Sequence, residues 1–386
     1  MPANPLPADP FGAAFEIHPD PALLVSAGDI DDTASRRVLA ANRAARDLLR
    51  IPAEGAPLVH AMRDPEVLEV VDESLFGGVA GSARWASGGV DERLWRALST
   101  PVGGDDGRLA LLVLHDETDA RLAERTRADF MANASHELRT PLASLAGFIE
   151  TLRGHAREDP EARERFLMIM ADQTNRMSRL VDDLLSLSRI ELNEHVPPSG
   201  VVDLAATIVD VADALGPLAK EGGVALRTKL PPPRSAWVSG DRDQIVQVVQ
   251  NLIDNALKYS PRGGAVVVEV TPGFTPDALA AERMEGAARI PLLTPARTAE
   301  HRYVAIRVTD QGPGMDREHL PRLAERFYRV GGQKSGARPG TGLGLAIVKH
   351  VVNRHRGGLA VESAPGVGSA FTVYFPVSGD ARRREP

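Results

Sequence analysis

The central segment of the chain, residues 117–194, constrains the fold most strongly, because its apolar residues recur at helical spacing over a length that one compact helix rarely occupies. Glycine is rare in this segment and charged residues are frequent. The one strong break is Asp159–Pro160. The pattern therefore predicts two long helices joined by a turn.

Each predicted helix carries an apolar seam. In the second helix the seam steps by four and three residues, as in a coiled coil with one polar member: Phe166, Met170, Gln173, Met177, Leu180, Leu184 and Leu187. The first helix has a similar series: Phe130, Ala134, Leu138, Leu142, Leu145, Ile149 and Leu152. One hairpin cannot bury both seams, so we expect a homodimer in which two hairpins form a four-helix bundle.

Two α/β segments flank the hairpin. Residues 21–116 contain short apolar runs between glycine-rich breaks, and residues 196–378 alternate between helix-like and strand-like patterns. We expect residues 1–20 and 379–386 to be a disordered lead-in and tail. Residues 272–301 make an unusually long connection between two predicted strands, which indicates a mobile insert or a partner-specific loop.

Composition excludes several classes of function. Cysteine is absent, so disulfides, thiol nucleophiles and cysteine-ligated metals are ruled out. The net charge is −7 and no long Lys/Arg run occurs, so we expect no nucleic-acid partner. No apolar run approaches the roughly 18–20 residues of a membrane-spanning helix, and no signal peptide is recognisable. We therefore expect a cytoplasmic location, with no membrane association encoded in this chain.

Three features suggest phosphate chemistry. Glycine clusters at residues 310–314 and 340–344 follow a predicted strand and precede a predicted helix, where the backbone can approach a phosphate. Either cluster alone fits an ordinary turn equally well, and neither has the pattern of a P-loop or a dinucleotide-binding turn. Between the hairpin and these clusters, Asn251, Asn255 and Lys258 share one face of a predicted helix with the adjacent Tyr259. Such residues suit magnesium and phosphate, although a polar surface stripe would look the same.

His136 lies on the face of the first long helix opposite its apolar seam. An outward histidine usually has no special role. Here, however, Thr140 lies one turn further along the same face, and Pro141 removes the helical donor for the Glu137 carbonyl. We therefore expect a site at which this helix bends.

Five motifs together resemble the sensor histidine kinases of two-component systems, and within them the phosphate-regulon sensor subgroup. They are SHELRTPL, NLIDNALKYS, DQGPGM, ERFYRV and GTGLGLAIVKHVV, in the family's order. The resemblance implies an ATP-dependent protein-histidine kinase that uses Mg²⁺. It would phosphorylate His136 and pass the phosphoryl group to an aspartate in the receiver domain of a response regulator. It also suggests a phosphatase activity toward that partner.

The resemblance also implies residue roles. Glu137 would orient the ring of His136 and accept its proton, and Glu137 with Thr140 would position a water for the reverse reaction. Asn255 would contribute to Mg²⁺ binding, and Asp310 would accept a hydrogen bond from the adenine amino group. The nucleotide site as a whole would comprise Asn251, Asn255, Lys258, Tyr259, Asp310, Gly312, Gly314, Phe327, Gly340, Thr341, Gly342, Leu343 and Gly344.

The implied fold is multidomain. Residues 21–116 would form a PAS-like α/β sensor domain. Residues 117–195 would form a signalling helix with the dimerisation and histidine phosphotransfer hairpin. Residues 196–378 would form a catalytic ATP-binding domain of the GHKL type, an α/β sandwich.

Two alternatives to the kinase function stay open: a scaffold that binds nucleotide and regulator without turnover, and a general ATPase.

Two further sets of residues have alternative roles. Lys334 and Arg338, in the predicted lid, could contact phosphate or merely keep the lid soluble. The aromatic residues Phe76, Trp85 and Trp95 are expected in the core or in a dimer contact rather than around a cofactor.

Overall fold

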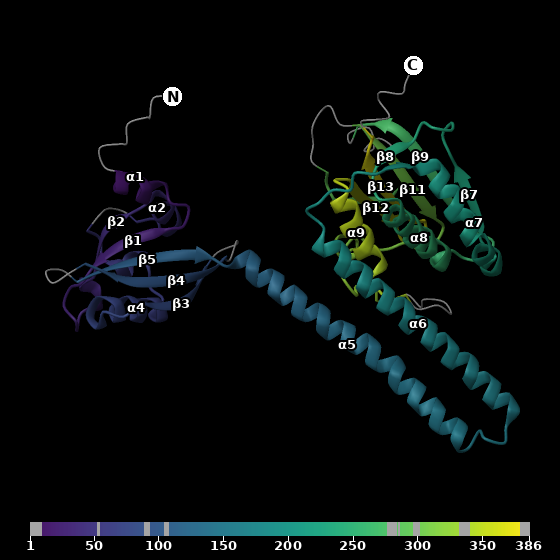
Figure 1. Ribbon diagram of the computed structural model, residues 1–386, viewed down its shortest axis with the longest axis horizontal. Helices are drawn as coiled ribbons and strands as arrows, with labels where there is room; N and C mark the ends of the chain where they lie inside the picture. Colours follow the sequence, from purple (N-terminus) through teal and green to yellow (C-terminus); the bar gives the residue numbers. More distant parts are fainter. Residues whose placement is uncertain are drawn as a thin grey trace. The chain divides into compact units, whose positions relative to one another are not determined.

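The computed structural model of the chain forms two compact units, Met1–Met131 and Ala132–Pro386, whose boundary lies inside one long helix. Figure 1 shows the elements of each unit. The structure describes residues 10–51, 55–88, 93–103, 108–275, 284, 286–295, 302–331 and 340–378.

The first unit is built on an antiparallel five-stranded sheet in the order β2-β1-β5-β4-β3 (Figure 1). The strands are β1 (Ala22–Ser26), β2 (Arg37–Ala41), β3 (Gly81–Ser87), β4 (Arg93–Val102) and β5 (Leu109–Asp116). The helices are α1 (Pro10–Ile17), η1 (Thr33–Ser35), α2 (Arg43–Leu49), α3 (Leu58–Ala61), α4 (Pro65–Asp72) and η2 (Glu73–Gly77). Alternate residues of β4 and β5 are buried, so one face of the sheet forms a core with α4 and its neighbours.

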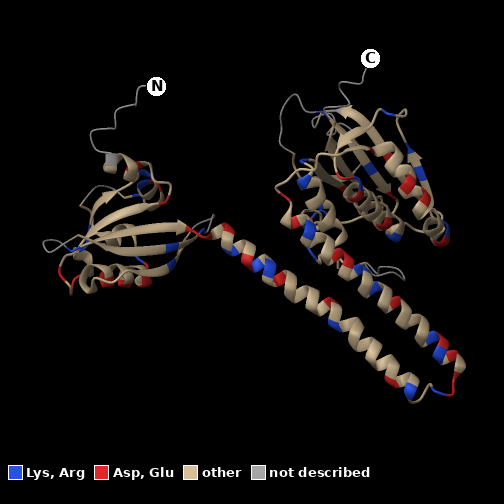
Figure 2. Cartoon of the chain, in the orientation of Figure 1, with Lys and Arg blue, Asp and Glu red and all other residues tan. Residues whose placement is uncertain are grey.

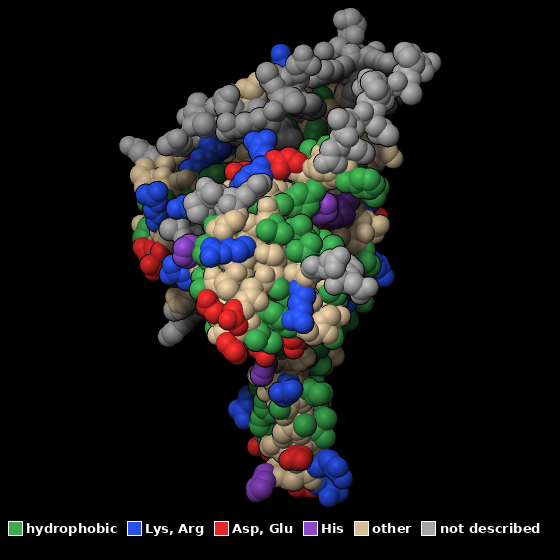
Figure 3. Space-filling model, turned by 90° about the vertical axis from the view of Figure 1, so that its left-hand side faces the viewer, with side chains coloured by type: hydrophobic (Ala, Val, Ile, Leu, Met, Phe, Trp, Pro, Cys, Tyr) green, Lys and Arg blue, Asp and Glu red, His purple; other side chains and the backbone are tan. Residues whose placement is uncertain are grey.

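This unit confirms the expected α/β segment and corrects one expectation. Trp95 is buried in its core, and Phe76 and Trp85 pack against that core, as expected. The disordered lead-in is wrong for residues 10–17, because they form α1. An ion pair between Glu16 and Arg46 of α2 ties this helix to the sheet domain. Apolar side chains also reach the surface of the unit (Figure 3). Between β1 and β5, the exposed large apolar residues of the described chain are Ile30, Leu39, Val79, Leu98 and Val102.

The predicted helical hairpin is confirmed by α5 (Thr118–Arg153) and α6 (Pro160–Leu192). Asp159 caps α6 by accepting hydrogen bonds from the first-turn N–H groups, and Pro160 takes the first helical position, so the break has a local cause. Charged residues of both signs occur along both helices, especially near the start of α5 and near the turn of the hairpin (Figure 2), as on solvated faces. The helix α5 continues through Pro141 without a break, so the proline does not end the helix there.

The remainder of the second unit is a mixed six-stranded sheet in the order β10-β12-β13-β11-β9-β7, in which only the β7–β9 pair is parallel among the described strands. The helices α7, α8 and α9 cover one face (Figure 1). The remaining pair is β6-β8. The bounds are β6 (Val201–Asp203), α7 (Leu204–Gly222), β7 (Ala225–Lys229), β8 (Trp237–Ser239), α8 (Arg242–Tyr259), β9 (Ala265–Phe274), β10 (Ala288–Leu293), β11 (Tyr303–Asp310), η4 (Leu320–Arg322), α9 (Gly344–Arg354), β12 (Gly358–Ala364) and β13 (Gly368–Pro376).

The segment 272–301 is not simply an insert. Its first residues continue β9, and residues 288–293 form β10, which pairs with β12 at the edge of the sheet. Pro291 lies in this strand, and proline is tolerated in sheets mainly at edges, so the sequence pattern gave no strand signal here. Residues 276–283, 285 and 296–301 lie outside the described part of the chain, as do Lys334, Arg338 and the tail at 379–386.

Candidate active site

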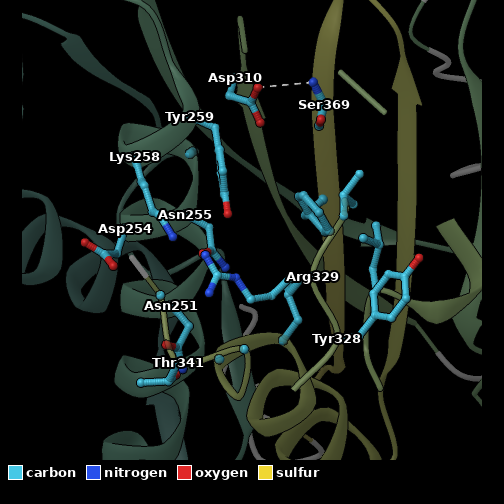
Figure 4. A pocket seen from close by; sticks show the side chains of 18 of the residues that line it. Asn251, Asp254, Asn255, Lys258, Tyr259, Asp310, Tyr328, Arg329, Thr341 and Ser369 are labelled. Atoms are coloured by element: carbon cyan, nitrogen blue, oxygen red, sulfur yellow. Dashed lines mark hydrogen bonds between the residues drawn. The ribbon is translucent and has the colours of Figure 1, made fainter. Parts of the chain in front are cut away.

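The polar face of α8 forms one wall of a pocket, which we call the α8 pocket (Figure 4). Asn251, Asn255, Lys258 and Tyr259 line it together, as the helical spacing predicted. The opposite face of α8 is buried, which fixes the orientation of the polar face. Asp254 of α8 also lines the pocket, and further lining residues lie on the sheet, at the start of α9, on the loops near it and on α6; they include Asp310, Gly314, Tyr328, Arg329, Gly340, Thr341, Gly342, Gly344, Ser369, Arg176, Arg179, Asp182 and Asp183.

Asp310 is the buried carboxylate of this pocket. Its Oδ1 atom accepts hydrogen bonds from the backbone N–H groups of Gly312, at 2.8 Å, and Ser369, at 3.2 Å (Figure 4). Burial raises the pKa of Asp310 to about 6, and the two hydrogen bonds oppose that rise. Both N–H donors bind the same oxygen, so the carboxylate is held in one orientation at the end of β11.

Two glycines shape the walls because no other residue fits their places. Gly314 has a φ of +70°, and a Cβ there would lie 1.8 Å from the carbonyl oxygen of Ala364. Gly342 has a φ of +76°, and its carbonyl accepts a hydrogen bond from the N–H of Phe327 at 2.9 Å. Both loops therefore require glycine for backbone reasons.

The second glycine cluster lies directly against α8. A Cβ at Gly340 would be 2.8 Å from Nζ of Lys258, and one at Gly344 would be 3.0 Å from Oδ1 of Asn251. The structure thus brings together motifs that are far apart in the sequence. Three expected site residues do not line the pocket: Gly312, Phe327 and Leu343. They support it instead through the backbone contacts described above and through the complete burial of Leu343 at the start of α9.

The α6 wall of the pocket was not anticipated from the sequence. The hydroxyl of Thr341 donates to Oδ2 of Asp183 at 2.7 Å. Burial raises the pKa of Asp183, and the neighbouring carboxylates of Asp182 and Asp254 add to that rise, while Thr341 and Arg179 oppose it. The periodicity of the sequence predicted only that α6 is a coiled-coil helix. Nothing in that pattern indicated that Arg179, Asp182 and Asp183 line a pocket with α8.

Further contacts fasten α6 to the sheet domain of the same unit. Ser186 donates to Gln247 at 2.9 Å, and Arg326 pairs with Glu191 at 2.6 Å. Tyr328 and Arg329 also line the pocket. They belong to the ERFYRV motif, of which only Phe327 was expected in the site. The motif therefore contained the information needed to predict them.

His136 is exposed on α5. The hydroxyl of Thr140 donates to the carbonyl oxygen of His136 at 3.3 Å, which keeps these two predicted residues together. Glu137 forms an ion pair with Arg176 of α6, with 3.0 Å between Oε2 and Nη2. Because Arg176 also lines the α8 pocket, this pair connects the segment around His136 to the pocket wall.

Two family models match parts of this chain. Residues 126–193 match the His Kinase A (phospho-acceptor) domain, and residues 240–379 match the histidine kinase-, DNA gyrase B-, and HSP90-like ATPase family. Among solved structures, the histidine kinase ThkA in complex with the response regulator protein TrrA aligns over 96% of this chain and 98% of its own, with 16% identity and a TM-score of 0.47.

The chain belongs to the sensor histidine kinases of two-component systems, whose ATPase domain uses ATP. Within that family it is similar to the phosphate regulon sensor protein PhoR of Pseudomonas aeruginosa, with 34% identity over 89% of this chain and 71% of PhoR. SenX3 of Mycobacterium tuberculosis strain H37Rv is 35% identical over 70% of this chain, which spans 59% of SenX3. The chain covers 40% of WalK of Bacillus subtilis.

This kinship overturns one expectation. A cytoplasmic location was expected from the lack of a long apolar run, but the related sensors PhoR, SenX3 and WalK are anchored in membranes. Within the described ranges, no helix has the length and apolarity needed to cross a bilayer. The expectation failed because it was drawn from the absence of an apolar run in this chain alone.

We expect Asp310→Asn to stabilise the fold while it weakens nucleotide binding. The raised pKa means that Asp310 favours the folded state fully below its ordinary pKa, and that this contribution is lost as pH rises through about 6. The asparagine variant should therefore gain up to about 3 kcal/mol over the wild type between pH 4 and pH 8. Urea unfolding at several pH values measures this difference.

The same variant should bind the ATP analogue AMP-PNP at least about tenfold more weakly, because an amide would present its donor to the adenine amino group. Isothermal titration calorimetry measures that affinity. The exposed Asp316→Asn is the matched control. A stability gain that does not grow with pH would contradict the assignment of the shifted pKa to Asp310.

We expect Asp183→Asn to tighten AMP-PNP binding by about threefold to tenfold at pH 7.5. The variant keeps an acceptor for Thr341 but removes one negative charge from the α6 wall of the pocket, and that charge would repel a bound triphosphate. Calorimetry with Asp172→Asn, an exposed residue of the same helix, as the control provides the measurement. An affinity within twofold of the wild type would show that this carboxylate does not oppose the nucleotide.

Proposed function

We propose that this chain transfers the γ-phosphoryl group of ATP to His136 and then to an aspartate in the receiver domain of a response regulator. The observation that carries the proposal is an exposed histidine whose neighbour Glu137 pairs with Arg176, a residue of the nucleotide pocket wall. A general ATPase would have no use for this connection.

The α8 pocket suits adenosine triphosphate. Since both backbone donors bind Oδ1 of Asp310, its Oδ2 is left to accept a hydrogen bond from the adenine amino group. At the C-terminal end of α8, Lys258 offers a positive charge for phosphate oxygens. The amide oxygen of Asn255 would help to hold Mg²⁺, a cation that prefers oxygen ligands. When bound, Mg²⁺ would neutralise phosphate charge.

The transfer needs a neutral imidazole, and histidine is largely neutral near pH 7. One ring nitrogen of His136 attacks the γ-phosphorus, the bond to the β,γ-bridging oxygen breaks, and ADP leaves with that electron pair. The proton on the other ring nitrogen passes to Glu137. Catalysis then rests mainly on in-line positioning and on charge neutralisation at the phosphate. Thr140, one turn from His136, would act with Glu137 in a reverse reaction on the phosphorylated partner.

The hairpin supports a homodimer. Seam residues of a single chain remain open to solvent: Leu142 is 58% exposed and Ile149 is 46% exposed. On α6, Leu185 is also 52% exposed. A second hairpin would cover these side chains in a four-helix bundle. The five-stranded sheet of the first unit, directly preceding α5, supports a PAS-like sensor domain as the source of the signal.

His136→Gln should abolish phosphorylation. In the wild type, γ-labelled ATP with Mg²⁺ should give label that is lost in acid and kept in alkali, as expected of a phosphorus–nitrogen bond. His155→Gln, a second exposed histidine of the hairpin, is the matched control and should retain the label. Label that survives in His136→Gln would defeat the proposal. Nucleotide binding without any label in the wild type would favour the scaffold alternative, and phosphate release independent of His136 would favour the ATPase.

Leu142→Asp should dissociate the homodimer, because a buried, unpaired carboxylate in the bundle is costly. Sedimentation velocity should change from a dimer to a monomer of 41.3 kDa. Ser144→Asp, on the opposite side of α5, should remain dimeric. A Leu142→Asp chain that sediments like the wild type would place the interface elsewhere.

A further inference from the structure

The side chain of Arg176 contacts α5 and also lies in the wall of the α8 pocket. Its Nη2 atom lies 3.0 Å from Oε2 of Glu137, and the same residue lines the α8 pocket. Glu137 follows His136 directly, so Arg176 lies between the phosphoacceptor segment and the space that the triphosphate would occupy. It is 22% exposed and Glu137 is 38% exposed, so water reaches both members of the pair.

Among the described pocket residues of α6, Arg176 is distinguished by this contact with α5. Arg179 donates instead to the carbonyl oxygen of Asn175, within its own helix. Asp183 accepts from Thr341 of the sheet domain. The neighbouring arginine therefore has a comparable charge and pocket position without the link to Glu137, which makes Arg179 a natural comparison.

The pairing with Glu137 conflicts with the role proposed for that carboxylate. A carboxylate held by a guanidinium is less free to accept a proton from an adjacent imidazole. An ion pair that water can reach is weak, so little free energy opposes its exchange. A terminal phosphate carries more charge than a carboxylate and presents several oxygens to the planar guanidinium fork, so it is the stronger partner.

We propose that Arg176 is a positioning residue that exchanges partners when nucleotide binds. In the empty pocket it holds Glu137 away from His136. When ATP enters, its guanidinium turns to the terminal phosphate, and the released carboxylate of Glu137 accepts the proton of the attacking imidazole. The availability of the base is thereby coupled to occupancy of the pocket. This inference rests on the proposed phosphorylation of His136.

The experiment follows the titration of His136 in the full-length chain by NMR of histidine labelled with ¹³C at Cε1. In Arg176→Gln without nucleotide, the freed carboxylate should move the titration of His136 to higher pH than in the wild type. The double variant Arg176→Gln with Glu137→Gln should show no such rise. Arg179→Gln removes the same charge from the pocket and should also leave the titration of His136 unchanged. The resonances of the remaining histidines report whether each variant is folded.

Kinetics give an independent readout. Arg176→Gln should raise the KM for ATP in autophosphorylation by about tenfold or more, and Arg176→Lys should recover part of the loss because it keeps the charge without the fork. Arg179→Gln should raise KM without the change in the titration of His136.

Two results would overturn the exchange: an unaltered titration of His136 in Arg176→Gln, or the same rise in the double variant. Failure of the proposed function is distinguishable from both, because in that case His136→Gln would still carry label whatever Arg176 does. If label depends on His136 but the titration does not respond to Arg176, only the partner exchange is wrong.

Discussion

The burial of one face of α8 determines the geometry of everything around it. Ile245, Val249 and Leu252 are completely or almost completely buried, and the helix packs against β9, β11, α7 and α9. Because that face is buried, the helical period places Asn251, Asn255 and Lys258 on the face of α8 that lines the pocket. The glycines at 340 and 344 then bring the start of α9 within a side chain's width of α8. Apolar packing thus places the polar chemistry.

The second consequence is electrostatic. The pocket contains the buried carboxylate Asp310 and, on the α6 wall, the carboxylates Asp182 and Asp183. Burial raises the pKa of both Asp310 and Asp183, but their surroundings differ. Asp310 is fixed by two backbone donors at the end of a strand, whereas Asp183 is held by the side chain of Thr341 on a different element. The first arrangement suits a permanent recognition group, and the second is a contact that can be broken when elements separate.

Some apolar residues of the hairpin are buried within the chain, whereas others remain exposed to solvent. Leu180, Leu187 and Ile190 of α6 are buried within the chain, while Leu142 and Ile149 of α5 are not. The C-terminal half of α6 therefore packs against the sheet domain of its own chain, and the rest of the seam is left for a partner. The contact between Glu137 and Arg176 lies between these two regions.

The sequence by itself determined the elements whose pattern is local. Asp159–Pro160 set the turn of the hairpin, the helical period set the polar face of α8, and the glycine clusters set the loops beside it. Tertiary structure alone decided what α6 contributes, because Asp183 and Thr341 are 158 residues apart and meet only through packing. The raised pKa of Asp310 also depends on tertiary structure, because burial causes it. The same holds for the strand β10, which could not be predicted from the sequence because it contains Pro291 and pairs at the edge of the sheet. Periodicity reports which face of one element is apolar, whereas the partner of that face is chosen by the packing of the whole chain.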